Sequence, residues 1–146
     1  MYTEDFRRLL NGVGCPDYRV VSKSRIAIGD PEIEALVGMI DFYSMTIRAF
    51  KLGSQEDICE DYGQVAYYLG TIPDHPSRFV LDDHHTFVTG KPMLVCGNTA
   101  AMVGETRYAP HFKVIGNRSV HYGPFDCKSG NSTQAVASAG AGGSCC

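Results

Sequence analysis

The chain has 146 residues, of which 44% are hydrophobic and 20% charged, a balance typical of one globular domain or of a small domain plus a fragment of a second. Its formal net charge is −3 and its basic residues are scattered, which argues against a nucleic-acid or anionic-membrane partner. No apolar run approaches the roughly 20 residues that cross a bilayer, and charges at positions 4, 5, 7 and 8 disfavour a signal peptide. We therefore expect a cytoplasmic protein with reduced thiols.

Two helices are predicted in the first forty residues. Thr3 is a candidate cap for the first, whose apolar face comprises Phe6, Leu9, Leu10 and Val13. The second begins at Asp30-Pro31-Glu32, where a capping side chain precedes a proline at the first helical position. Its apolar face comprises Ile33, Leu36, Val37 and Ile40.

Strands accompany these helices. Residues 18–22 and 26–28 are predicted as strands interrupted by Lys23 and Arg25, and residues 42–51 as one long half-buried strand. We expect 18–22 to pair antiparallel with 42–51. Four carboxylates surround Cys59 in residues 53–61, a composition that favours a solvated loop.

From residue 62 onward the pattern is mostly strand. The predicted strands are 65–71, 79–81, 86–88, 93–96, 113–115 and 119–122. Gly116-Asn117 indicates a two-residue hairpin between the last two. Asn98 is a candidate cap for one helix that runs to about Tyr108, before Pro110. The predicted fold class is therefore α/β in the broad sense (α+β), with a small, mostly antiparallel sheet and one helix in residues 62–125.

The last nineteen residues, 128–146, consist mainly of Gly, Ala and Ser and end in Cys145 and Cys146. These small side chains bury too little surface to offset the conformational entropy lost on ordering, and we therefore predict a flexible tether. Adjacent thiols on a tether can chelate a soft ion or close a strained disulfide. The pair is our candidate soft-metal site, against the alternative of a dispensable terminus.

Other candidate sites have weaker support. No glycine-rich turn joins a strand to a helix, so no cradle for a nucleotide or adenosyl cofactor is encoded. Asp82-Asp83-His84-His85 resembles a metal site, but adjacent strand side chains point to opposite faces, which favours a polar edge or turn. The remaining cysteines, at 15, 59, 96 and 127, lack the close spacing of zinc ligands and are interpreted as ordinary buried or half-buried thiols.

Several segments nevertheless resemble one known family, the arsenite S-adenosylmethionine methyltransferases of the microbial and algal type. The resemblance is to the C-terminal part of that family and covers residues 1–127. The segments that carry it are residues 48–52, 60–66, 84–87, 97–100 and 118–127, together with the terminal Cys145-Cys146.

The resemblance implies the end of a longer enzyme. Residues 1–52 would be the last helix–strand elements of a class I methyltransferase sheet, 53–127 a C-terminal α+β domain, and 128–146 the tail. The upstream domain would bind S-adenosylmethionine and methylate arsenite. The family's last catalytic cysteine would precede residue 1, so this chain would hold no catalytic or cofactor-binding residue and be inactive alone.

Two alternatives stay open. A self-standing thiolate module would bind arsenite or a soft metal through Cys145 and Cys146, and a purely structural domain would pack its helix faces on a partner chain. The terminal pair should bind arsenite more weakly than a preorganised three-thiol site. Replacing both cysteines by Ser should lower arsenite retention without changing the fold. If retention is unaffected, a pair such as Cys96 and Cys127 is the next candidate.

Overall fold

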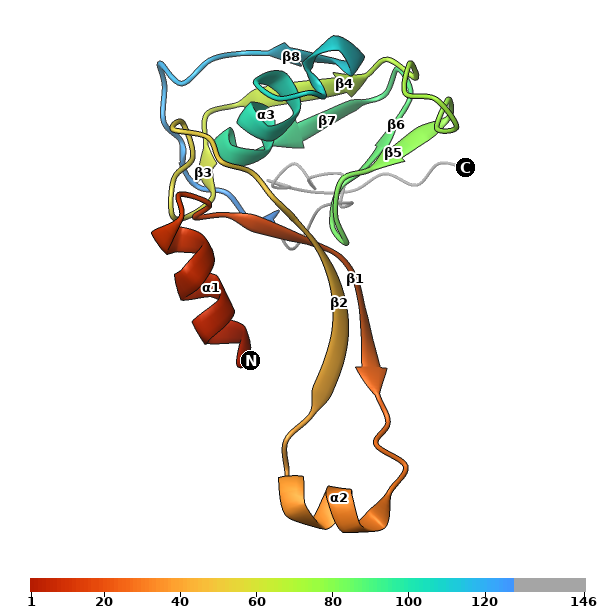
Figure 1. The fold of residues 1–146 in the computed structure, drawn as a ribbon. Coiled ribbons are helices and arrows are strands. Elements are labelled where there is room, and N and C mark those ends of the chain that lie inside the picture. The colour runs from red at the N-terminus through yellow and green to blue at the C-terminus, as the bar shows by residue number, and fades with distance from the viewer. Residues whose placement is uncertain (128–146) are drawn as a thin grey trace, which may run out of the picture.

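The computed structural model describes residues 1–127; Cys145, Cys146 and the predicted tether lie outside the described residues. A long antiparallel hairpin, formed by β1 (Tyr18–Ile26) and β2 (Phe42–Ala49), extends away from the rest of the chain. Helix α2 (Pro31–Val37) lies at its far end and α1 (Thr3–Gly12) beside its base (Figure 1). The two predicted helices and the antiparallel pairing are confirmed, with Tyr18 opposite Ala49.

Two details of this region differ from the prediction. Strand β1 is continuous through Lys23 and Arg25, because the ribbon is exposed there and both charges find partners. The Lys23 ammonium lies 4.1 Å from the centre of the Tyr43 ring, and Arg25 pairs with Asp41 at 2.6 Å. Thr3 is not a cap; the first helix begins at Thr3 and Tyr2 occupies the N-cap without a side-chain bond.

The cap of α2 is as predicted. The Asp30 carboxylate accepts hydrogen bonds from the backbone N–H of Glu32 at 2.9 Å and of Ile33 at 3.2 Å. These bonds satisfy two N–H groups that have no partner within the helix. A helix of only seven residues therefore has a defined start.

The remaining strands form small antiparallel sheets, as predicted. The largest has the order β7-β4-β8, with β4 at Gln64–Tyr68, β7 at Pro92–Val95 and β8 at Phe112–Ile115. Strands β5 (Arg78–Val80) and β6 (Thr86–Val88) form a second pair, and β3 (Glu60–Asp61) and β9 (Gly123–Pro124) a third. Helix α3 (Gly97–Gly104) packs against the largest sheet, and the short 3-10 helix η1 (Ala109–His111) leads into β8.

Three predictions about this region were wrong. Helix α3 begins after Cys96, not Asn98, as its N-cap, and it ends at Gly104 instead of near Tyr108. No hairpin forms at Gly116-Asn117 and residues 119–122 are not a strand, because β8 pairs with β4 and the chain then continues to β9, which pairs with β3. The 53–61 segment is not simply solvated, since several of its side chains are half-buried against α3.

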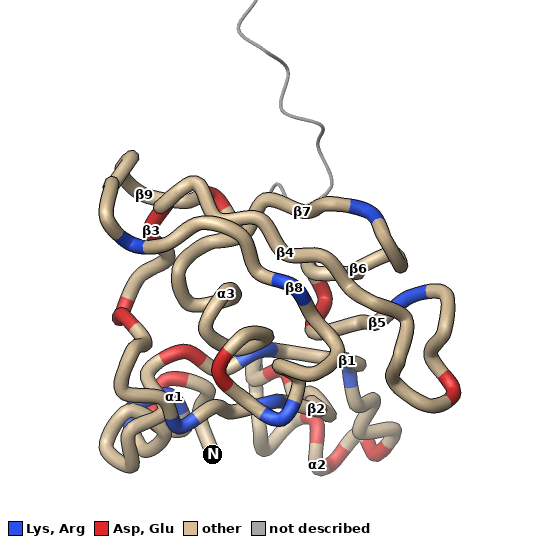
Figure 2. The backbone as a smooth tube through the Cα atoms, turned by 90° about the horizontal axis from the view of Figure 1, so that it is seen from above, with Lys and Arg blue, Asp and Glu red and all other residues tan. Residues whose placement is uncertain are grey.

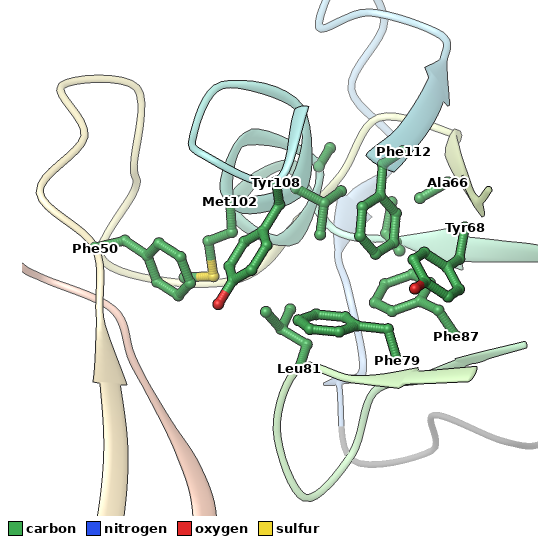
Figure 3. Packing of buried hydrophobic residues seen from close by; sticks show 12 residues of the cluster. Phe50, Ala66, Tyr68, Phe79, Leu81, Phe87, Met102, Tyr108 and Phe112 are labelled. Carbon is green, nitrogen blue, oxygen red and sulfur yellow. The ribbon is translucent and has the colours of Figure 1, made fainter. Parts of the chain in front are cut away.

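The hydrophobic core lies between α3 and the sheets and is rich in aromatic rings (Figure 3). Phe87 is fully buried, and its ring centre lies 5.0 Å from that of Phe112 in an edge-on arrangement. Phe79 contacts the rings of Tyr68, Tyr108 and Phe112. Phe50, directly after β2, joins the core at its edge and thereby connects the hairpin to the sheets.

Charged residues are spread over the part of the chain that the structure describes. Basic and acidic positions are interspersed along the described backbone (Figure 2). Within residues 1–127, every helix is too short or too polar to cross a bilayer.

Candidate functional site: a cluster of three cysteines

Three cysteines that are far apart in the sequence meet in the structure. The Sγ atoms of Cys59, Cys96 and Cys127 all lie within 4.8 Å of one another. Cys96 is fully buried, whereas Cys59 and Cys127 are half-buried. Among the described residues, no other group of three or more His, Cys, Asp or Glu side chains converges at such a distance.

Pairing of the two shortest strands brings Cys59 and Cys127 together. Cys59 directly precedes β3, and Cys127 follows β9, its antiparallel partner. The backbone N–H of Phe125 donates to the Cys59 carbonyl at 2.8 Å, and that of Cys127 to the Phe125 carbonyl at 3.1 Å. This backbone pairing places the two cysteines at the same end of the ribbon.

Cys96 is positioned by the start of α3. It follows β7 directly and occupies the N-cap, where its sulfur accepts from the backbone N–H of Thr99 at 3.4 Å. The Thr99 hydroxyl lies 3.2 Å from the same sulfur. A side chain that satisfies the first turn of a helix has a fixed direction, so the Cys96 thiol is held in place.

Several residues that carried the family resemblance fix the loop before Cys59. The Asn98 side chain, 1% exposed, donates to the Glu56 carbonyl at 2.7 Å and accepts from the Glu56 N–H at 2.8 Å. The Arg118 guanidinium donates to the carbonyl groups of Ser54 and Gly97. Gly97 is needed here, because a Cβ would lie 2.9 Å from the ring of Tyr62.

A buried arginine lies beside the cluster. Arg19 is 7% exposed and donates to the Asp17 carboxylate at 2.8 Å and to the Thr99 hydroxyl at 3.1 Å. Its Nη2 lies 3.9 Å from Cys96 Sγ, and its Nη1 lies 3.5 Å from Asp82 Oδ2. Although burial opposes it, the negative charge around the guanidinium raises the Arg19 pKa, so Arg19 keeps its charge.

The three thiols share their protons unequally. Hydrogen bonds from Cys127 and then from Cys59 hold the pKa of Cys96 well below its usual range, against the effect of burial. The hydrogen bonds with Cys59 and Cys96 raise the pKa of Cys127 above its usual range. For Cys59, a bond with Cys127 lowers the pKa, but the bond with Cys96 and burial outweigh it and raise the pKa to about 12. The cluster thus favours one thiolate, on Cys96, beside two protonated thiols.

The Asp82-Asp83-His84-His85 segment forms a turn, as interpreted from the sequence, and it has a supporting role. Asp82 and His85 are buried, with 2.8 Å between Asp82 Oδ1 and His85 Nδ1, whereas Asp83 and His84 are exposed. The Asp82 carboxylate also accepts from the backbone N–H of His84 and His85. Two of the four side chains therefore converge, and their carboxylate faces Arg19.

Asp82 makes the stability of the folded chain depend on pH in the acidic range. Burial opposes its ionisation, but the bonds from His85 and His84 and the charge of Arg19 outweigh burial and lower the Asp82 pKa below its ordinary 3.8. The stabilisation is therefore complete above about pH 4 and is lost as pH falls through the lowered pKa of the folded state. In urea titrations at pH 5 and pH 3, Asp82→Asn should reduce the loss of unfolding free energy between the two. Asp83→Asn, at the exposed neighbour, should lose as much unfolding free energy between pH 5 and pH 3 as the wild type. An equal loss for both variants would contradict the prediction.

The sequence interpretation missed the cluster. It treated Cys59, Cys96 and Cys127 as ordinary thiols and named Cys96 with Cys127 only as the next candidate pair. It placed the candidate site at Cys145 and Cys146, which lie outside the described residues. Gaps of more than thirty residues carry no ligand-spacing signal. The one usable signal was the possibility that the short segments next to Cys59 and Cys127 pair with each other.

Three sulfurs at this distance have a limited chemistry. Thiolates are soft ligands that select thiophilic centres, and one such centre can bond all three sulfurs at once. Two of the thiols could instead form a disulfide if an oxidant were supplied. All four cysteines of residues 1–127, including the three of the cluster, are free thiols in the structure.

Comparison with known proteins gives consistent matches. A family model described as the arsenite methyltransferase C-terminal domain matches residues 61–146. An arsenite methyltransferase of Aquipseudomonas alcaligenes is 44% identical over an aligned stretch of 147 positions, which covers 100% of this chain and 42% of the relative. The Mus musculus arsenite methyltransferase is 31% identical over 115 residues, or 77% of this chain and 29% of the relative.

A solved structure agrees with these sequence matches. The X-ray structure of an arsenic (III) S-adenosylmethionine methyltransferase from Chlamydomonas reinhardtii superposes with a TM-score of 0.83 and 57% sequence identity. The match covers 86% of this chain and 42% of that chain. The resemblance predicted from the sequence is thereby confirmed, and the chain spans less than half the length of these relatives.

Proposed function

Because the chain belongs to the arsenite methyltransferase C-terminal domain family, we propose that it serves an enzyme that transfers a methyl group from S-adenosylmethionine to trivalent arsenic. In this proposal the whole protein acts in the cytoplasm, with arsenite as its substrate and arsenic detoxification as its role. The upstream domain supplies the cofactor site and the catalytic cysteines. This chain contributes no catalytic or cofactor-binding residue and is inactive alone.

The observation that carries this proposal is the unpartnered apolar surface of residues 1–52. Along the described chain, neither α1 nor α2 has a buried residue, although α1 contains Phe6, Leu9 and Leu10 of its predicted apolar face and α2 contains Ile33, Leu36 and Val37 of its own. Val13 and Ile40, the last residues of the two predicted faces, lie beyond the helix ends. The large apolar side chains exposed there include Leu9, Val13, Ile33, Leu36, Met39, Ile40 and Phe42. An exposed apolar surface of this kind supports contact with a partner domain.

We assign that partner to the upstream methyltransferase domain of the same protein. The bacterial relative has more than half of its length outside the match, which is enough for such a domain. Residues 1–52 would complete the edge of its sheet, and residues 53–127 would form the separate C-terminal domain. A groove of about 460 Å³ at the hairpin tip, lined in part by Ile26, Ile40 and Phe42, would take up side chains of that domain.

The proposal is tested by separating and rejoining the two parts. The 146-residue chain alone should neither bind S-adenosylmethionine in calorimetry nor methylate arsenite, because no strand–turn–helix cradle for the cofactor is encoded. Fusion to the upstream part of the bacterial relative should restore methylation, measured by chromatography of arsenic species. Micromolar cofactor binding by the chain alone would contradict the assignment.

A charge on the proposed contact surface should weaken the association of the two parts. Leu36 is 85% exposed on α2, so Leu36→Asp should leave the isolated chain folded but lower its affinity for a co-expressed upstream part about 10-fold or more. Val120→Asp, at an exposed position outside the hairpin, is the control and should leave that affinity unchanged. A pull-down in which the recovered upstream part is quantified measures both variants. Equal recovery with Leu36→Asp and Val120→Asp would show that the hairpin is not part of the interface.

The sequence supports a second candidate, a thiolate module that binds arsenite or a soft metal through Cys145 and Cys146. Two thiols leave a third position of trivalent arsenic for another thiol, so this pair should hold arsenite weakly. Replacing both cysteines by Ser should remove only the weakly bound equivalent of arsenic. The arsenic content of the chain, measured at rising arsenite concentration, checks this. An unchanged saturation curve would remove the pair as a site.

A further inference from the structure

We propose that Cys59, Cys96 and Cys127 form a preorganised site for trivalent arsenic, in which one arsenic atom is bonded to all three sulfurs. The site lies within the C-terminal domain, apart from the methyl-transfer site proposed for the upstream domain. The inference relies on the proposed function only for the choice of arsenic among thiophilic centres.

The number of sulfurs favours arsenic over zinc. Structural zinc sites are nearly always tetrahedral, with four protein ligands. Within residues 1–127, the group of converging ligand atoms contains three sulfurs and neither imidazole nor carboxylate. Trivalent arsenic forms three bonds and directs a lone pair to the fourth corner, so three thiols complete its coordination.

The surrounding structure holds the sulfurs before any ligand binds. Cys96 is fixed by its N-cap bond from Thr99, and Cys59 and Cys127 are fixed by the pairing of β3 with β9. Little conformational entropy is left to lose on binding, which raises affinity relative to thiols on an unstructured segment. Cys59 and Cys127 are half-buried, so an arsenical can enter from their side and reach the buried Cys96.

A positive charge lies beside the cluster and favours the ionised, nucleophilic form of its sulfur. The Arg19 guanidinium has its Nη2 3.9 Å from Cys96 Sγ. A neighbouring positive charge favours the thiolate, which is the form that attacks an electrophilic centre. Arg19 therefore favours the reactive form of sulfur at the buried end of the cluster.

The reaction balances without an oxidant or reductant. Each As–S bond forms as one As–O bond of arsenous acid breaks, and the departing hydroxide leaves as water with one proton. Three thiol equivalents thus release three waters, and arsenic stays trivalent; the proton missing from the Cys96 thiolate comes from solvent. A monomethyl arsenical has only two replaceable oxygens and a dimethyl arsenical one. The site therefore selects unmethylated arsenite over methylated products.

The test uses the reduced, metal-free 146-residue chain incubated with arsenite under nitrogen and passed through gel filtration. We expect one tightly retained arsenic per chain, by elemental analysis, with three sulfur neighbours in X-ray absorption spectra. Monomethyl and dimethyl arsenicals should be retained progressively more weakly. Retention of zinc that arsenite cannot displace, or an arsenic with two sulfur neighbours, would overturn the assignment.

Single variants locate the site. Cys59→Ser, Cys96→Ser and Cys127→Ser should each lower arsenite affinity about 10-fold or more, a change of about 1.4 kcal/mol, because a bond is lost from the chelate. Serine is a favoured N-cap residue, so Cys96→Ser keeps the start of α3, which circular dichroism and thermal melting verify. Cys15→Ser, at a buried cysteine outside the cluster, is the matched control and should bind as wild type.

The double variant Cys145→Ser/Cys146→Ser separates the two thiolate sites. This variant should keep the tightly held arsenic with three sulfur neighbours. If the variant no longer retains that arsenic, the site is at the terminal pair and the inference is overturned. The proposed function has an independent readout. If the cluster fails to bind arsenite while the fused enzyme methylates it, only the cluster assignment is wrong.

Discussion

Arg19→Met should lower the free energy of unfolding by about 3–5 kcal/mol, because the substitution removes the cation that faces the buried Asp82 carboxylate and the half-buried Asp17 carboxylate. The wild-type guanidinium pairs with Asp17 at 2.8 Å and faces Asp82 at 3.5 Å, and it is 7% exposed. Methionine fills a similar volume but offers no positive charge. Urea denaturation at pH 7 measures the change.

The same substitution at an exposed ion pair provides the control. Arg25 pairs with Asp41 at 2.6 Å, but the two side chains are 72% and 50% exposed. Exposed pairs contribute about 0–1 kcal/mol, so Arg25→Met should lie within that range. Adding Asp82→Asn to Arg19→Met should recover part of the loss, because one uncompensated charge is removed. Equal effects of the two arginine variants would show that Arg19 does not hold a buried charge network.

Phe87→Ala should destabilise the chain by about 3–5 kcal/mol, since it removes a ring from a packed interior and leaves a cavity. The Phe87 side chain is fully buried, stacks on His85 at 6.3 Å between ring centres, and meets Phe112 edge-on. Thermal and urea denaturation of the isolated chain measure the loss.

Phe42→Ala is the matched control for this truncation. Phe42 lies on the exposed hairpin, where its side chain is 42% accessible, so the isolated chain should lose much less than with Phe87→Ala. In the fused enzyme the same variant should be more costly, because Phe42 would then be covered by the upstream domain. A large loss in the isolated chain would mean that the hairpin is packed there.

Local sequence signals determined the elements whose stabilising contacts are also local. The cap at Asp30 acts on N–H groups two and three residues away, so its chemistry is visible in the sequence. The antiparallel pairing of β1 with β2 followed from two β-branched and aromatic segments joined by a short helix. The turn at Asp82 was likewise recognisable, because the Asp82 carboxylate accepts from the backbone N–H of His84 and His85, two and three residues further along the chain.

The family, too, was recognisable from the sequence, through segments that include Gly97, Asn98 and Arg118. Their physical task appeared only in the structure. Asn98 was expected to cap a helix, but it holds the loop before Cys59, and Cys96 takes the cap instead. Both residue types can accept a helix N–H, and local chemistry alone does not choose between them.

Only the tertiary structure decided the location of the thiol cluster. Cys59 and Cys127 meet through two-residue strands, whose pairing is too short to leave a periodic pattern in the sequence. Cys96 reaches them because α3 packs beside that ribbon, and Arg19 arrives from the base of the hairpin. Contacts between distant segments depend on how the whole core closes, so the sequence determined which thiols exist and the fold determined which of them meet.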